Sequence, residues 1–175
     1  MRSLISQKIT LANSEHLREE NPMINESLKL KGDLTIQVIG KDGKVKERRE
    51  EKNLVVNTGL GFIASRMEGT SAGVMSHMAI GSGTTAAAAG DTDLESILGV
   101  REPLDSTTAN GASGNGTIVF VSSFEAGEGT GAVTEAGTFN ASTGGDMLCR
   151  TVFPVVNKGA DDTLSITWTI TLSAS

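Results

Sequence analysis

The segment of residues 163–173 alternates strictly between apolar and polar side chains. A period of two predicts a β-strand, because successive side chains of a strand point to opposite faces. At about 3.3 Å per residue this strand spans about 36 Å. Its polar face carries only Ser and Thr, without the charges that protect exposed edges. We therefore expect the strand to lie centrally in a sheet or under another chain. Its apolar face consists of Leu164, Ile166, Trp168, Ile170 and Leu172.

A β-hairpin is predicted near the start of the chain. Residues 34–39 alternate in the same way, and Asp42-Gly43 after them is a strong turn signal. The return strand, residues 45–52, is highly charged. That composition suits a solvent-facing edge of a sheet.

One helix is predicted, over residues 58–67, after a short buried strand at residues 53–57. Asn57 or Thr58 is expected to cap its first turn, since both residue types accept hydrogen bonds from free backbone N–H groups. The expected apolar stripe consists of Leu60, Ile63, Ala64 and Met67.

The rest of the chain predicts short strands separated by Gly-rich turns. We also expect a helical turn at residues 93–98, capped by Asp91 or Thr92, and a loop at residues 107–116. This organisation predicts an all-β fold, mainly an antiparallel, jelly-roll-like β-sandwich, with one short helix. The further strands are expected at residues 76–83, 117–125, 132–140 and 147–156.

Residues 1–31 have a different character and are predicted to form an extended N-terminal arm, with the sandwich domain at residues 32–175. The arm is too polar to bury a core of its own. Met23 is a candidate internal translation start, which would make residues 1–22 an extension. Scattered apolar side chains are its candidate partner-binding residues: Leu4, Ile5, Ile9, Leu11 and Leu17.

Charge limits the classes of partner. The net charge is −6, and from Asn53 onward 4 Lys and Arg face 12 Asp and Glu, a balance of 4 − 12 = −8. An acidic body repels nucleic acid, so no nucleic-acid partner is expected. An apolar run of 18 residues is absent from the sequence, so no membrane span is expected either.

Residue types suited to catalysis are sparse, and no enzymatic activity, cofactor or metal is expected. His16 and His77 are far apart in the sequence, and the single Cys149 lies in a strand-like segment where burial is the favoured interpretation. The carboxylates of residues 91–95 have a suggestive spacing for a cation, but helix capping is preferred because the other oxygen ligands are missing. Glu135 is expected to pair with an arginine, either Arg101 or Arg150.

Four segments, in order along the chain, resemble virion proteins of tailed bacteriophages. They are NLVVNTG at residues 53–59, HMAIGSGTT at 77–85, TEAGTFN at 134–140 and DTLSITWTI at 162–170. The Glu-Ala-Gly-x-Phe piece resembles one found in tail-fibre, baseplate and head-decoration proteins. No catalytic residue carries over from this resemblance.

The resemblance implies a structural protein of the virion, assembled in the host cytoplasm. The preferred expectation is a capsid decoration, or cement, protein that binds the major capsid protein or other virion proteins as a homo-oligomer, dimer or trimer. The alternatives are a tail, baseplate or tail-fibre component and, third, a host-glycan-binding module. A glycan site is disfavoured because Tyr is absent and the single Trp lies on an apolar strand face.

Overall fold

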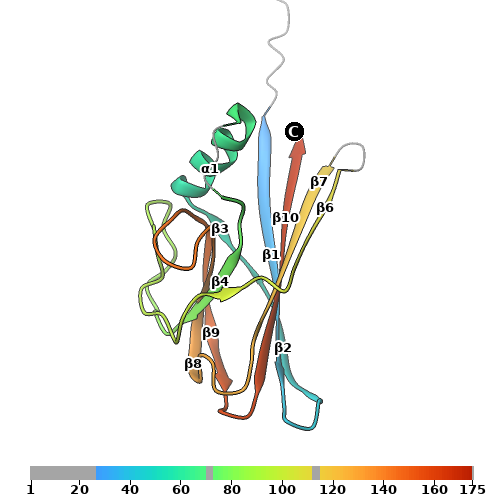
Figure 1. Ribbon diagram of the computed structural model, residues 1–175, viewed down its shortest axis with the longest axis vertical. Coiled ribbons are helices and arrows are strands. Elements are labelled where there is room, and N and C mark those ends of the chain that lie inside the picture. The colour runs from blue at the N-terminus through green and yellow to red at the C-terminus, as the bar shows by residue number, and fades with distance from the viewer. Residues whose placement is uncertain (1–26, 70–72, 112–114, 175) are drawn as a thin grey trace, which may run out of the picture.

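The computed structural model describes residues 27–69, 73–111 and 115–174. Two five-stranded sheets face each other, with strand orders β2-β1-β10-β7-β6 and β3-β9-β8-β4-β5, and all pairings are antiparallel. Figure 1 shows the two layers side by side. The predicted all-β sandwich is therefore confirmed, while the finer jelly-roll assignment stays a prediction.

The first sheet, called sheet A, is built around the strand whose alternation is strictest. β10 pairs with β1 along its whole length and with β7 on its other side. The predicted central position of this strand is confirmed. The strands of sheet A are β1 (Leu28–Ile39), β2 (Val45–Lys52), β6 (Ser106–Asn110), β7 (Asn115–Phe124) and β10 (Thr163–Ala174).

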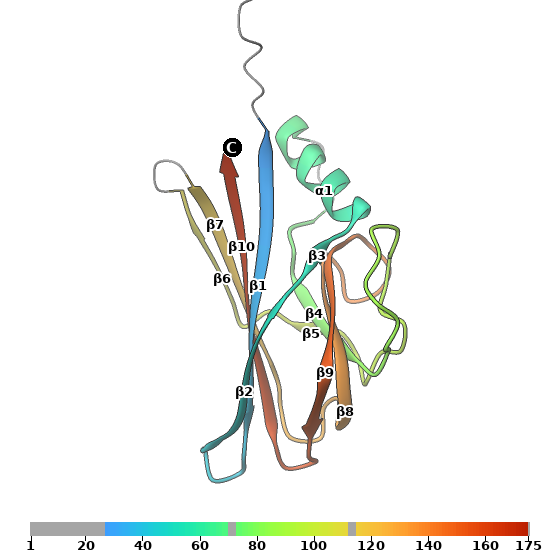
Figure 2. The same cartoon turned by 180° about the vertical axis from the view of Figure 1, so that it is seen from behind.

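The second sheet, called sheet B, is centred on the hairpin of β8 and β9. One helix, α1 (Asn57–Glu68), follows the short edge strand β3 and lies at the end of the sandwich where β1 begins and β10 ends (Figures 1 and 2). The strands of sheet B are β3 (Leu54–Val55), β4 (His77–Gly81), β5 (Glu102–Pro103), β8 (Gly131–Phe139) and β9 (Met147–Lys158).

The core lies between the sheets and follows the predicted alternation. Across sheet A, Leu34, Trp168 and Phe120 stand side by side in one buried row. Met78 and Phe153 come from sheet B and belong to the same buried cluster. Trp168 is 0% exposed. The apolar faces that the sequence pattern predicted thus form the main core between the sheets, and a second, smaller cluster consists of Val56, Ala79, Phe139 and Met147.

The charged hairpin is also confirmed. Gly43 has φ +75° at the turn, a left-handed conformation that suits glycine. β2 forms one edge of sheet A, and its charges pair with neighbours on the surface, for example Lys52 with Asp33 at 2.9 Å. Charge on this edge discourages pairing with foreign strands.

β1 is longer than the sequence pattern predicted. It begins at Leu28, opposite Ala174 of β10, so residues 28–31 belong to the sheet and not to an arm. Leu30 pairs with Leu172, which extends the apolar face toward the end of the sandwich. The five arm residues singled out as partner-binding lie outside the described residues.

The predicted helix exists, but its predicted cap is wrong, and of its predicted apolar stripe only Ile63 packs against the core. The N-cap is Val56, without a side-chain hydrogen bond, while the Thr58 hydroxyl donates to the carbonyl of Met147. Met67 is 84% exposed. The buried position is Gly59, where an added Cβ would lie 2.2 Å from the Leu148 carbonyl oxygen. Close backbone contact at Gly59, together with Phe62 and Ile63 packed against the core, therefore holds α1 on the sandwich.

Two predictions between β4 and β7 are wrong. Residues 93–98 form an irregular loop, with one bridge from Ile97 to Gly81, and no helical turn. Residues 106–110 form strand β6, where a loop was expected. β6 contains only Ser, Thr, Ala and Asn, so it lacks the hydrophobic signal of a strand, and pairing with β7 determines its conformation.

A small polar group closes the opposite end of the sandwich. Lys158 is 2% exposed, and its ammonium donates to the carbonyls of Glu125 and Asp162. The Asp162 carboxylate accepts from Lys46 at 2.6 Å and from the Gly159 N–H. The hydrogen bond from Lys46 is the main cause that lowers the pKa of Asp162 below its ordinary value of 3.8.

This lowered pKa predicts a pH dependence of stability. The carboxylate's contribution is present above pH 3.8 and is lost as the pH falls through the lower folded value. Asp162→Asn should therefore flatten the fall in unfolding free energy between about pH 5 and pH 2, as measured by urea titrations. The matched control is Asp161→Asn at the neighbouring, 74% exposed carboxylate. Equal slopes for both variants and the wild type would contradict the prediction.

Candidate interaction site

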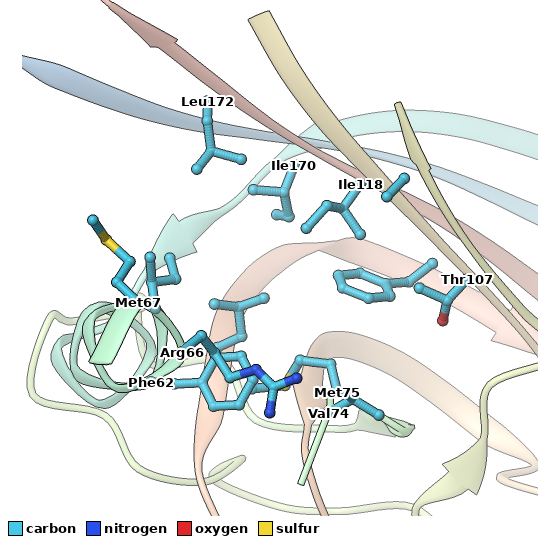
Figure 3. A pocket seen from close by; sticks show the side chains of 13 residues that line it. Phe62, Arg66, Met67, Val74, Met75, Thr107, Ile118, Ile170 and Leu172 are labelled. Atoms are coloured by element: carbon cyan, nitrogen blue, oxygen red, sulfur yellow. The ribbon is translucent and has the colours of Figure 1, made fainter. Parts of the chain in front are cut away.

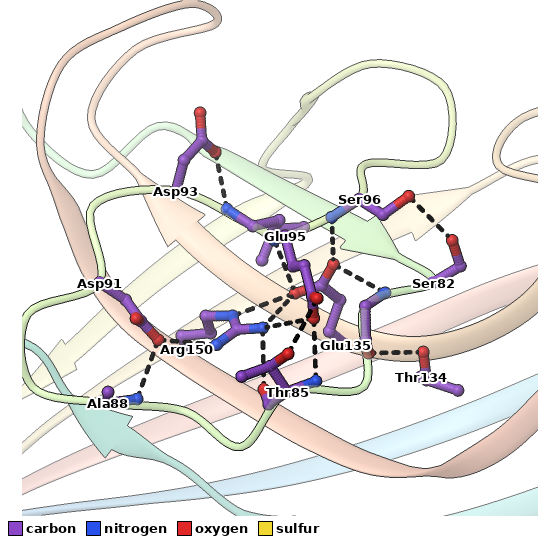
Figure 4. Close-up of polar contacts among 12 residues, drawn as sticks. Ser82, Thr85, Ala88, Asp91, Asp93, Glu95, Ser96, Thr134, Glu135 and Arg150 are labelled. Carbon is purple, nitrogen blue, oxygen red and sulfur yellow. Dashed lines mark hydrogen bonds and ion pairs between the residues drawn. The ribbon is translucent and has the colours of Figure 1, made fainter.

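The most connected polar side chain of the described structure is Glu135, which is 0% exposed on β8. One carboxylate oxygen accepts from the N–H groups of Gly83 and Ser96, and the other accepts from the Glu95 N–H. The guanidinium of Arg150, on β9, donates twice to that second oxygen at 3.0 and 2.8 Å (Figure 4). The predicted pairing of Glu135 with an arginine is confirmed, and the partner is Arg150.

Arg150 and Arg101 tie the loop of residues 82–98 to sheet B. Arg150 also binds the Asp91 carboxylate at 2.7 Å. The Ala88 N–H, followed by this guanidinium, lowers the pKa of Asp91. Arg101 binds Asp93 at 3.0 Å, and its guanidinium lies 3.6 Å above the centre of the Phe139 ring. The expected capping role of Asp91 is therefore wrong, because its carboxylate holds an arginine.

The cluster around Glu135 has a structural role: it fixes the loop of residues 82–98 to sheet B, and we call it the Glu135 lock. Each oxygen of Glu135 already accepts two or more hydrogen bonds, so neither is free to bind a substrate. The Glu-Ala-Gly-x-Phe segment supplies Glu135, a buried Ala136 and the ring of Phe139. Within the described residues, no group of three His, Cys, Asp or Glu side chains could hold a metal ion.

The remaining chemical candidates are equally enclosed. Cys149 is buried, and burial raises the pKa of its thiol to about 12, so little thiolate forms near neutral pH. His77 is half-buried, and its Nδ1 lies 2.8 Å from the hydroxyl of its neighbour Ser76. His16 lies outside the described residues.

The outer face of sheet A is a candidate contact surface. The hydroxyl side of β10 points away from the core, and Figures 1 and 2 show that all other described elements lie on the far side of this sheet. Two rows of uncharged side chains cross it, and we call them the threonine face. The first row crosses β1, β10, β7 and β6 and consists of Thr35, Thr167, Val121 and Ser106. The second row crosses β10, β7 and β6 and consists of Thr169, Val119 and Thr108.

Charged side chains border the threonine face on one side only. Along β2 and the start of β1, Arg48 pairs with Glu50, and Lys31 and Lys52 pair with Asp33. On β10, β7 and β6 the outward side chains in both rows are uncharged. An uncharged centre with a charged margin on one side resembles the buried core and polar rim of protein interfaces.

A second exposed surface is the apolar groove between α1 and the inner face of sheet A. It encloses about 520 Å³, and Figure 3 shows its lining side chains between the helix and the strands of the sheet. Met67 and Val74, on its rim, are 84% and 60% exposed. Its lining is almost entirely apolar and includes Phe62, Met67, Val74, Ile118, Ile170 and Leu172.

The chain matches no family model, and comparisons with curated proteins and with solved structures gave no match. No helix in the described part of the chain is long and apolar enough to cross a membrane. The candidate site therefore rests on geometry alone.

The sequence identified one of the two surfaces. The hydroxyl face of β10 was recognisable from its alternation, although its extension onto β7 and β6 requires the strand order. The groove was not recognisable, because it is formed by five elements and a connecting segment. Met67 was assigned to a buried stripe, and the structure places it on the exposed rim.

Proposed function

We propose that this protein is a non-enzymatic structural component of a tailed-phage virion, and that it decorates and stabilises the capsid. The sequence resemblance suggests the virion. The observation that carries a binding role is the threonine face: a central part of the outer face of the sheet whose side chains are half-buried or exposed, uncharged and mostly β-branched. Side chains of this kind lose little rotamer freedom when covered, because their χ1 angles are already restricted.

Capsid cementing follows from this face by mass action. A contact that exists only on the assembled shell stabilises that shell over its free subunits. The contact needs no catalytic group, only complementary area repeated over many copies. The hydrogen bonds of the Glu135 lock and the main core between the sheets hold the domain in one compact shape, which such a contact requires.

Copy number tests the proposal against a role in the tail. Purified particles would be analysed by quantitative mass spectrometry, with the major capsid protein as the internal standard. Hundreds of copies per particle are expected for a decoration protein. A few copies to a few dozen would contradict decoration and favour a tail, baseplate or fibre component.

A charge placed in the threonine face should weaken attachment. Thr167→Arg puts a cation at the centre of the face, where burial against a partner would leave it unpaired. We expect at least about tenfold weaker binding to particles that lack the protein, equivalent to about 1.4 kcal/mol. Binding is measured by co-sedimentation. Glu50→Arg, on the charged margin, is the matched control, and equal binding by both variants would show that this face is not the contact surface.

A further inference from the structure

The two edge strands of sheet A are protected very differently against pairing with another strand. β2 ends sheet A on one side and carries charged side chains at seven of its eight positions. β6 ends the same sheet on the other side, and its sequence STTAN has neither charge nor proline. All five of its residues are exposed. An uncharged open edge readily accepts another strand, so β6 is the edge on which a further strand would pair.

The apolar groove lies directly beside this edge. Thr107 and Ala109, on β6, line it together with Phe62 of α1, Val74 and Ile118. A strand added to β6 would place every second side chain on the inner face of sheet A. Those side chains would enter the groove and cover apolar surface that now faces solvent.

The chain itself contains a segment with the matching pattern. From residue 5 to residue 11 the odd positions are Ile5, Gln7, Ile9 and Leu11, and the even positions are polar. This alternation presents one largely apolar face with a period of two. Leu4 and Leu17 fall outside that face.

The geometry allows the segment to reach the edge of its own molecule. β1 begins at Leu28 at the end of the sandwich where α1 lies (Figures 1 and 2). β6 is three strands away across the sheet, a distance of about 14 Å. The residues 12–27, which connect the segment to β1, span up to about 50 Å when extended.

We propose that residues 5–11 add a strand to the open edge of β6 in the same chain, with Ile5, Ile9 and Leu11 covering the apolar groove. Main-chain hydrogen bonds to β6 give affinity, and the alternate apolar side chains give register. The short tether raises the effective concentration to the millimolar range, which favours the chain's own segment over that of a second copy. This proposal is independent of the virion role.

Cross-linking in the full chain tests both the contact and its origin. Ile9→Cys combined with Ala109→Cys is treated with a short bismaleimide, while the native Cys149 is buried and stays unreactive. A cross-linked product of monomer mass is expected. A product of dimer mass would contradict the proposal in favour of a second copy, and no cross-link would contradict both. Ile9→Cys with Lys44→Cys, in the turn at the opposite end of the sandwich, is the matched control and should not cross-link.

Hydrogen exchange in the full chain gives a second, independent test. Among the backbone amides of Thr107 to Asn110, those that point away from β7 should exchange at least about tenfold faster in the Ile9→Asp/Leu11→Asp variant, because the strand that pairs with them is lost. Thr10→Asp, on the polar face of the same segment, should leave that rate unchanged. Equal exchange in all three proteins would overturn the proposal. Fluorescence of the single Trp168 verifies that each variant remains folded.

Discussion

Replacing Glu135 with alanine is expected to lower the free energy of unfolding by about 3–5 kcal/mol. The substitution removes the one fully buried ion-pair partner that the described residues give the Arg150 guanidinium, whose own side chain is 3% exposed, and leaves it only Asp91, which is 23% exposed, at close range. It also removes the acceptor for the N–H groups of Gly83 and Ser96. Breaking a buried ion pair and leaving the Gly83 N–H without its acceptor are among the largest single-residue penalties known.

Urea denaturation of the wild type and the variant measures this loss. Glu50→Ala removes a carboxylate that also pairs with an arginine, but its side chain is 73% exposed, so the loss there should stay below about 1 kcal/mol. Glu135→Gln retains the acceptor oxygen and should fall between the two. If Glu135→Ala and Glu50→Ala cost the same, the cluster is not the lock that its hydrogen bonds indicate.

Replacing Trp168 with alanine is expected to cost about 3–5 kcal/mol, because it opens a cavity in the middle of the core. Trp168 stands between Leu34 and Phe120 in one row of sheet A and is 0% exposed. Within the described structure its indole Nε1 has no hydrogen-bond partner. The ring contributes through its volume, and not through its N–H.

Trp168→Phe separates these contributions. Phenylalanine removes the N–H but keeps most of the ring, so its loss should be clearly smaller than that of alanine. Thr169→Ala, the next residue on the outer face, is the surface control and should change stability by well under about 1 kcal/mol. Thermal melts of the three variants measure the differences. An unshifted melt of Trp168→Ala would contradict the core position.

The sequence predicted the parts of the fold that local patterns determine. β10, the charged hairpin and the burial of Trp168 all follow from a period of two and one Asp-Gly turn. Pairing between distant segments determines the rest. β6 has no hydrophobic signal of its own and is a strand only because β7 lies beside it.

The helix shows the same limit in another form. A stripe of large apolar side chains predicts which face of an isolated helix is buried, but α1 contacts β9 through Gly59.

The surfaces proposed for binding were predictable in part. The hydroxyl side of β10 was visible in the sequence, whereas the groove depends on how α1 and sheet A meet. The candidate binding residues Leu4, Ile5, Ile9, Leu11 and Leu17 lie outside the described residues, so that prediction stays a prediction.

The way Glu135 holds the loop of residues 82–98 has a consequence for sequence variation. Its carboxylate binds main-chain N–H groups of Gly83, Glu95 and Ser96, which every residue except proline possesses. Ala86 and Gly90, between these anchor points, are exposed. Exposed positions such as Ala86 can therefore change in sequence while the path of the loop stays the same, whereas Gly83 has no room for a Cβ and Asp91 binds Arg150 through its side chain.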